Sequence, residues 1–421
     1  MKYFGYIFLI IISTLFLIFT FIHFNFFSLK DGLYEKYPNL SIRKYLFKNE
    51  PIFEKIYNDY NVKFIPFTEL IKLDYKKKKI NFINDYYEKK SQNKNISYSK
   101  YGSFYIDLHK KNVFLTDYLG NNYYLKTSAI LSEKYNLDST NIKNNISNIE
   151  RVYDAIIYKD EIFITYVKKI KNCAKIFVSK AKISTINLEY KNIFVSKSCH
   201  DNASPGRMVI HELEKKKGIL LSISSGAYNA PSMEAQNKLK IYGKIIFIDL
   251  NSGEYKVISS GHRVVQGLVK YNEVIIATEH GPRGGDEINI IKQDKNYGWP
   301  ISSYGEKYNF KYEKKPNYKK NHTSYGFEEP IYAFMPAIGI SEIIKLPEYF
   351  SEMLQNVFIV SSLYGKNIFF IKFDNEFNRV IFSEKIFLND RIRDLKFENK
   401  NDLILLALEE NGEIGVIKKY N

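Results

Sequence analysis

The chain has 421 residues, a formal net charge of +16 and 45% hydrophobic residues, which is ordinary for a globular protein with a sizeable core. Only eight of its 62 basic residues are arginines, and its lysines are scattered without the pattern of a zinc finger, a helix-turn-helix or an RNA-binding motif. This composition argues against a nucleic-acid partner and is compatible with contact with an anionic membrane surface.

The N-terminal segment predicts a membrane anchor. Tyr3 to Phe27 is an uncharged, mostly apolar run of 25 residues, which is long enough to span a bilayer and longer than a typical signal-peptide core. No small-x-small cleavage site follows, so residues 1–28 are interpreted as an uncleaved transmembrane helix and residues 29–61 as a charged stalk. A buried core helix is the weaker alternative.

The orientation of the predicted anchor is a separate question. The flanking lysines alone favour a cytoplasmic body, but large downstream domains translocate largely regardless of charge. We expect a single-pass protein of a bacterial inner membrane with a periplasmic body.

Residues 62–421 predict one all-β domain made of repeats. Each unit is an apolar strand, a tight charged turn and a denser apolar strand, and the units start at Gly102, Val152, Met208, Val264, Ile340 and Arg391. The starts are 50, 56, 56, 76 and 51 residues apart, and near-equal periods of this size indicate a β-propeller. We therefore predict six blades around a central cleft. An irregular β-sandwich, the alternative, predicts no even period.

The two cysteines, Cys173 and Cys199, lie 26 residues apart in strand-like segments. A disulfide formed in an oxidising compartment and a pair of buried free thiols both fit this spacing.

The longest interval between repeats contains the segment EHGPRGGDEINIIKQDKNYGWPISSYG, from Glu279 to Gly305. Its glycines leave backbone carbonyls uncovered, and Asp286 and Glu287 add carboxylates directly after them. Carbonyls and carboxylates at short spacing suit a hard cation such as Ca²⁺. The same residue types fit a tight loop between blades that binds no metal equally well.

The motifs GHRVVQGL (Gly261–Leu268), ATEHGPRGGDEINII and KNYGWP together resemble the signature of the soluble PQQ-dependent glucose/sorbosone (aldose sugar) dehydrogenases. Looser matches, FMPAIGISEI, NVFIVSSL and RIRDL, follow in the expected order. The resemblance implies a six-bladed propeller that oxidises a sugar at C1 by hydride transfer to PQQ and passes electrons to an unidentified acceptor. It also implies a Ca²⁺ ion that polarises the quinone and a histidine that acts as general base.

The resemblance assigns roles by position. The carbonyls of Gly281 and Pro282 would hold the cofactor-bridging Ca²⁺, while Glu287 and the Tyr297 carbonyl match a second, structural Ca²⁺ site near Asp286. Together these positions predict that Ca²⁺ stabilises the fold. The residues expected to contact PQQ are Arg263, Gln266, Arg391 and Arg393. A tricarboxylate explains why arginine persists there in a lysine-rich chain, because lysine cannot form a forked pair.

The chain departs from the family pattern where the chemistry is expected. Ala203 occupies the position of the catalytic histidine, Ala227 that of its partner aspartate, and Val264 that of a motif asparagine. Tyr364 lies near the position of a cofactor-contacting lysine. His200, three residues before Ala203, is the remaining candidate base, and an ordinary surface-loop histidine is the alternative interpretation.

Three hypotheses follow. The first is a PQQ- and Ca²⁺-dependent sugar dehydrogenase with an altered base. The second is a catalytically inactive propeller that binds a sugar, a polyanion or a protein partner. The third, a Ca²⁺-dependent lactonase or hydrolase, lacks a nucleophile that the sequence identifies.

Overall fold

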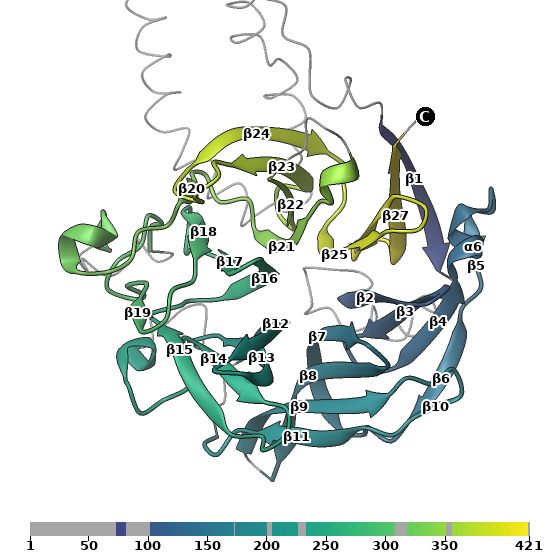
Figure 1. Ribbon diagram of the computed structural model, residues 1–421, viewed down its shortest axis with the longest axis horizontal. Coiled ribbons are helices and arrows are strands. Elements are labelled where there is room, and N and C mark those ends of the chain that lie inside the picture. Colours follow the sequence, from purple (N-terminus) through teal and green to yellow (C-terminus); the bar gives the residue numbers. More distant parts are fainter. Residues whose placement is uncertain are drawn as a thin grey trace, which may run out of the picture. The chain divides into compact units, whose positions relative to one another are not determined.

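The computed structural model describes residues 73–80, 102–171, 173–199, 204–225, 233–307, 318–350 and 356–419. Within these ranges the chain forms six sheets of four or five strands around a common axis (Figure 1). The predicted six-bladed all-β propeller is therefore confirmed. The predicted anchor (1–28) and stalk (29–61) lie outside the described residues. Among the helices that the structure does describe, none is long and apolar enough to cross a membrane.

Each blade starts with the hairpin of one predicted repeat. Blade 1 contains β2 (Phe104–His109), β3 (Asn112–Asp117), β4 (Asn122–Lys126) and β6 (Thr140–Asn144). Blade 2 contains β7 (Ile149–Tyr158), β8 (Glu161–Ile170), β9 (Cys173–Lys182) and β11 (Lys191–Val195). Blade 3 contains β12 (Pro205–Leu213), β13 (Lys216–Ile223), β14 (Lys244–Asp249) and β15 (Tyr255–Ser260).

Blade 4 contains β16 (Val265–Tyr271), β17 (Val274–Glu279), β18 (Asp286–Ile290) and β20 (Tyr332–Phe334). Blade 5 contains β21 (Ile340–Lys345), β22 (Val357–Ser362), β23 (Asn367–Phe373) and β24 (Val380–Phe387). Blade 6 contains β25 (Ile392–Glu398), β26 (Leu403–Leu408), β27 (Glu413–Lys419) and β1 (Leu73–Ile80). Short elements complete the fold: α6 (Thr127–Leu131), β5 (Asn136–Leu137), β10 (Asn187–Leu188), β19 (Lys295–Asn296), η1 (Met233–Gln236), η2 (His322–Tyr325) and η3 (Glu348–Phe350).

The repeat pattern has a local cause. The charged turns of the first hairpins contain residues with left-handed backbone, among them Lys110, Lys159, Asn272 and Asp402. Such turns match the twist of the strands that they join. The second strand of each hairpin is the denser apolar one because it packs against the blades on both sides, and every residue of β26 is buried. The hydrophobic core therefore lies between neighbouring blades, as where Ile359 and Phe370 of blade 5 join Leu406 of blade 6 in one cluster.

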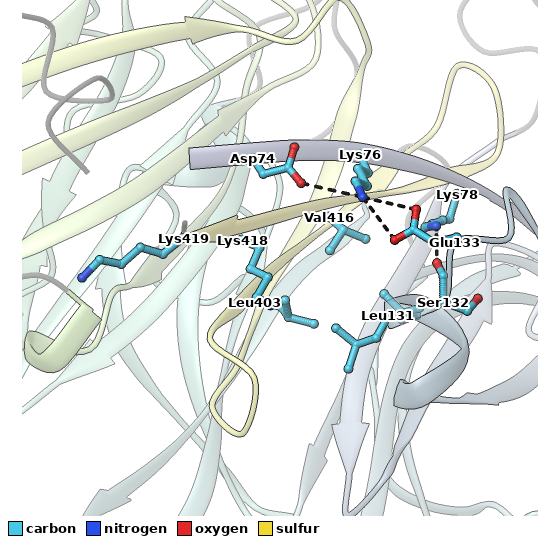
Figure 2. A pocket seen from close by; sticks show the side chains of 11 residues that line it. Asp74, Lys76, Lys78, Leu131, Ser132, Glu133, Leu403, Val416, Lys418 and Lys419 are labelled. Atoms are coloured by element: carbon cyan, nitrogen blue, oxygen red, sulfur yellow. Dashed lines mark hydrogen bonds and ion pairs between the residues drawn. The ribbon is translucent and has the colours of Figure 1, made fainter. Parts of the chain in front are cut away.

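The ring is closed by the two ends of the described chain. β1 pairs antiparallel with β27, from Leu73 opposite Lys419 to Lys79 opposite Glu413. A groove of about 370 Å³ lies beside this seam (Figure 2). Lys76 pairs there with Glu133 at 3.4 Å, and Lys78 Nζ donates to the Ser132 carbonyl at 2.6 Å. These lysines hold blade 6 to blade 1 beside the groove, which Lys418 and Lys419 also line.

Cys173 and Cys199 form a disulfide with 5.1 Å between their Cα atoms. The bond joins the start of β9 to the chain beyond β11, the outermost strand of blade 2. Of the two interpretations left open by the sequence, the structure has the disulfide.

Replacing both cysteines by serine is expected to lower the free energy of unfolding by about 3 kcal/mol, because the bond restricts a loop of intermediate length in the unfolded chain. Chemical denaturation measures this difference, and wild-type protein kept in reductant should match the double variant. Coincident midpoints for oxidised and reduced protein would contradict the expectation.

Candidate functional site

Arg207, on the innermost strand of blade 3, is a buried guanidinium that ties all six blades together at the axis. Figure 1 shows the innermost strands β2, β7, β12, β16, β21 and β25 converging there. The partners of Arg207 come from the five other innermost strands: the Tyr105 ring (5.0 Å), Asp154 (2.9 Å), the Gln266 carbonyl (2.7 Å), Glu342 (3.0 Å), Asp394 (3.1 Å) and the Arg393 carbonyl (2.5 Å).

The charge of Arg207 is fixed by these carboxylates. Burial opposes the charged form, but Glu342, Asp394 and Asp154 outweigh it and raise the pKa of Arg207. Asp154 and Asp394 also accept backbone N–H bonds at 2.7 Å from Met208 and Ile106, each on the first strand of the following blade. Arg207 therefore sets the spacing between blades and holds the backbone at two residues predicted to bind cofactor, Gln266 and Arg393.

A second cluster joins Arg391 and Arg393 through Glu409. The Glu409 carboxylate accepts from Arg391 Nε at 2.9 Å and from Arg393 Nε at 2.8 Å. Burial opposes ionisation of Glu409, yet Arg393 and Arg391 lower its pKa to about 2. Gln266 Oε1 accepts from Arg393 Nη1 at 3.0 Å, so the structure brings three of the predicted cofactor residues together. No hydrogen bond links the terminal nitrogens Nη1 and Nη2 of Arg391 to any residue that the structure describes.

Burial and the three arginines predicted to face PQQ together lower the pKa of one imidazole, that of His280. Burial, followed by the charges of Arg263, Arg393 and Arg391, lowers the pKa of His280 to about 3. Arg263 Nη1 also donates to the His280 carbonyl at 3.0 Å, and its guanidinium lies 5.3 Å from the centre of the Trp299 ring. The region is thus electropositive and contains a neutral histidine. It suits an anionic ligand with several carboxylates.

The glycine-rich loop directly follows His280. At Gly281 a Cβ atom would lie 2.1 Å from the Gly285 carbonyl oxygen, so the loop closes only with glycine there. The carbonyl oxygens of Gly281 and Pro282 accept no backbone hydrogen bond from the described residues. Asp286 holds the loop in place, because its carboxylate accepts N–H bonds from Gly281 at 3.0 Å and from Ile338 and Ile340 at 2.9 Å.

The two residues assigned to the second Ca²⁺ position meet at a histidine that the sequence reasoning did not consider. His322 Nδ1 lies 3.1 Å from the Tyr297 carbonyl oxygen, and His322 Nε2 lies 3.5 Å from Glu287 Oε1. Across the described ranges, no group of three or more His, Cys, Asp or Glu residues is arranged to hold a metal ion.

Some predicted positions lie outside the described residues, namely His200, Ala203 and Ala227, so the candidate base stays a prediction. Val264 is buried, and its carbonyl accepts the His280 N–H at 2.9 Å. Lys366, the lysine nearest to Tyr364, forms an ion pair with Glu410 at 2.6 Å.

The sequence reasoning missed the acidic partners of the arginines. Glu409 follows directly after the wholly apolar run LILLAL of β26, and a charge at that point indicates a buried partner. Arg151, which the sequence analysis does not single out, belongs to the same cluster: its Nη2 donates to Ser103 Oγ at 2.9 Å, and Ser103 Oγ donates to Glu409 at 3.0 Å. Arg283, in contrast, is exposed, and its backbone pairs with that of Glu306.

Comparisons with known proteins agree with the fold. The family model described as Glucose / Sorbosone dehydrogenase matches residues 157–416. The aldose sugar dehydrogenase YliI of Escherichia coli is 28% identical over 206 residues, 44% of this chain and 54% of that protein. An uncharacterized protein of Synechocystis is 29% identical over 224 residues, 47% of this chain and 52% of that protein. The chain thus spans about half the length of the curated relatives that it matches.

Solved structures show the same architecture. The apo form of the soluble aldose sugar dehydrogenase from Escherichia coli superposes with a TM-score of 0.63 at 18% identity, covering 75% of this chain and 95% of that one. The PQQ-bound form of an aldose sugar dehydrogenase from Streptomyces coelicolor has a TM-score of 0.56 at 14% identity, covering 75% and 93%. At these identities the likeness establishes the fold.

Proposed function

Because the chain belongs to the glucose/sorbosone dehydrogenase family, we propose that it is a PQQ-dependent aldose dehydrogenase-like protein whose catalytic base has diverged. The observation that carries this proposal is the grouping of Arg391, Arg393 and Gln266 around Glu409, with Arg263 bound to the His280 carbonyl. His280 directly precedes the carbonyls of Gly281 and Pro282, which accept no backbone hydrogen bond from the described residues. An anion of several carboxylates and a hard cation would find their ligands side by side there.

The donor set fits PQQ. Glu409 neutralises one of the three guanidinium charges and orients Arg391 and Arg393 through their Nε atoms. The terminal nitrogens of Arg391, which no described residue engages, can form a fork with a carboxylate of the cofactor. Gln266 fixes Arg393 from the other side. A rigid, positively charged frame of this kind reduces the ordering that binding requires.

The proposed Ca²⁺ ion fits one of its two predicted positions. The carbonyls of Gly281 and Pro282 are available to a cation that the cofactor would also ligate, since two carbonyls alone supply too few of the six to eight oxygens that Ca²⁺ takes. The second position does not fit, because the His322 ring faces both Glu287 and the Tyr297 carbonyl.

When bound, the quinone would accept the hydride from the sugar C1. The chain's own part is to hold the cofactor carboxylates with arginines, to leave carbonyls for the cation, and to remove the proton of the C1 hydroxyl. Ala203 and Ala227 supply no group for the last task, and His200 is the candidate that remains. We therefore propose slow sugar oxidation.

The alternative function is a catalytically inactive propeller that binds a sugar, a polyanion or a protein partner. The substitutions at Ala203, Ala227 and Val264 favour it, because loss of a base and its orienting carboxylate together is the result expected when selection on the chemistry relaxes.

We also propose that the protein is tethered to a bacterial inner membrane by residues 1–28, with the propeller in the periplasm. The apolar run Tyr3–Phe27 supports the tether. The disulfide between Cys173 and Cys199 supports an oxidising compartment.

Titration with PQQ in the presence of Ca²⁺ tests the proposed function. Wild-type protein should show the shifted absorbance of a bound quinone, and Arg391→Met should bind about tenfold to a hundredfold more weakly, because a charge-assisted hydrogen bond contributes about 1.5–3 kcal/mol. Arg391 suits this test because Arg393 still compensates Glu409 in the variant. Arg379→Met is the matched control, since Arg379 is exposed and pairs only with Asp374 at 3.5 Å. Equal PQQ affinity in both variants would show that Arg391 does not contact the cofactor. Absence of PQQ binding by the wild-type protein would favour the alternative function, a catalytically inactive propeller that binds another ligand.

A further inference from the structure

Two buried glutamates face each other across blade 4. Glu279 of β17 and Glu287 of β18 are partners in the strand register, and both are buried. Like charges directly opposite each other destabilise a sheet. The pair therefore needs compensating groups close by.

Each glutamate has its own histidine. His262 Nδ1 lies 2.9 Å from Glu279 Oε2, and His322 Nε2 lies 3.5 Å from Glu287 Oε1. Both histidines are buried. The two rings meet at Tyr297, whose side chain stacks on His262 with 4.6 Å between ring centres and whose carbonyl faces His322. The four residues form two imidazole–carboxylate pairs on one side of the sheet.

His322 lies in the insertion between β19 and β20, and contacts within that insertion hold it in place. The ring stacks on Tyr304 with 5.2 Å between ring centres, and the His322 carbonyl accepts the Phe327 N–H at 3.1 Å. The next residue, Thr323, donates its backbone N–H and its hydroxyl to Glu329 at 3.0 and 2.9 Å. The η2 turn is therefore fixed on both sides of the ring, and His322 is not a side chain that happens to lie near Glu287.

Both oxygens assigned to the second Ca²⁺ position face the His322 ring. A carbonyl only accepts, so Nδ1 carries a hydrogen and donates it to the Tyr297 carbonyl oxygen at 3.1 Å. Nε2, on the opposite side of the ring, lies 3.5 Å from Glu287 Oε1 and has no hydrogen-bond partner among the described residues. Ca²⁺ takes six to eight oxygen ligands at about 2.3–2.6 Å, and a ring nitrogen is not among its preferred ligands.

We propose that the His322 imidazole takes the place for which the family resemblance predicted a second, structural Ca²⁺, so that Glu287 and the Tyr297 carbonyl are bridged by a side chain and not by a metal ion. This proposal concerns the protein without quinone and does not depend on the proposed dehydrogenase function.

The test compares melting temperatures of the full-length protein without quinone in excess Ca²⁺ and in excess chelator, for wild type and Glu287→Gln. The glutamine keeps the shape of the side chain and removes its charge. We expect the two proteins to respond equally to Ca²⁺. A stabilisation by Ca²⁺ that is larger in wild type than in Glu287→Gln would place an ion on Glu287 and overturn the proposal.

A second variant tests the ring itself. His322→Ala takes the donor from the Tyr297 carbonyl and leaves Glu287 only its hydrogen bond from Asn289 Nδ2 at 3.3 Å. It should melt roughly 5 °C lower than wild type, because a buried acceptor is left unpaired and a cavity replaces the ring. His109→Ala is the matched control, because His109 is also largely buried but pairs at 2.8 Å with the exposed Asp160 and not with a buried carboxylate. An unchanged melting temperature for His322→Ala would show that the ring compensates nothing. Should that variant not fold, His322→Asn replaces it, and the Ca²⁺ comparison with Glu287→Gln stands by itself.

Discussion

Replacement of Arg207 by methionine is expected to unfold the propeller, or to lower its free energy of unfolding by at least about 3–5 kcal/mol, the usual effect of removing one partner from a buried ion pair. Asp154, Glu342 and Asp394 would all stay buried without their shared positive charge. A typical domain has only about 5–15 kcal/mol of stability in total. The loss of this one side chain at the axis is therefore large enough to unfold the whole propeller.

Arg207→Lys distinguishes charge from geometry. Lysine keeps the positive charge but lacks the planar fork, so it cannot reach the Gln266 and Arg393 carbonyls and the carboxylates together. We expect its stability to lie between those of wild type and Arg207→Met in chemical denaturation. Arg379→Met, on the surface, should change the stability by no more than about 1 kcal/mol. A stable, fully folded Arg207→Met protein would refute the view that this arginine joins the six blades.

Restoring the base is expected to raise sugar oxidation about 10²–10⁴-fold, which is the usual contribution of a positioned general base. The change is Ala203→His combined with Ala227→Asp, because the histidine needs a carboxylate to orient its ring. Neither single substitution should reproduce the effect, since an unoriented histidine loses most of its advantage. The measurement is turnover with a dye acceptor at equal PQQ occupancy, so that differences in binding do not enter the rate.

His200→Ala is the companion variant in that assay. Fast wild-type turnover that collapses in His200→Ala would identify His200 as the base and the chain as an ordinary enzyme of its family. Slow wild-type turnover that rises only in the double variant would show that the scaffold retains the cofactor site after losing the base. Binding of PQQ without turnover in any variant would favour a non-catalytic propeller.

The sequence alone was sufficient to predict the six blades. Each repeat is a hairpin whose apolar strands and charged turn lie within about twenty residues. Its pattern is therefore local and can be recognised directly in the sequence. The family motif was equally visible, because the glycine-rich loop and the residues that follow it are contiguous. The scarcity of arginine drew attention to Arg263, Arg391 and Arg393, which are all at least largely buried.

Only the tertiary structure decided which of these groups meet. Arg207 is 53 residues from Asp154 and 187 residues from Asp394, and no local pattern connects them. The spacing of Cys173 and Cys199 left a disulfide and two free thiols open until the folded blade placed their Cα atoms 5.1 Å apart. His322 lies in an insertion without a periodic pattern, so nothing in the sequence singled it out. Its contacts with Glu287 and the Tyr297 carbonyl are visible only in the folded structure. The physical reason is the closure of the ring, which brings the first strand of every blade to one axis and turns remote residues into neighbours, whereas sequence patterns record only contacts that a single hairpin makes.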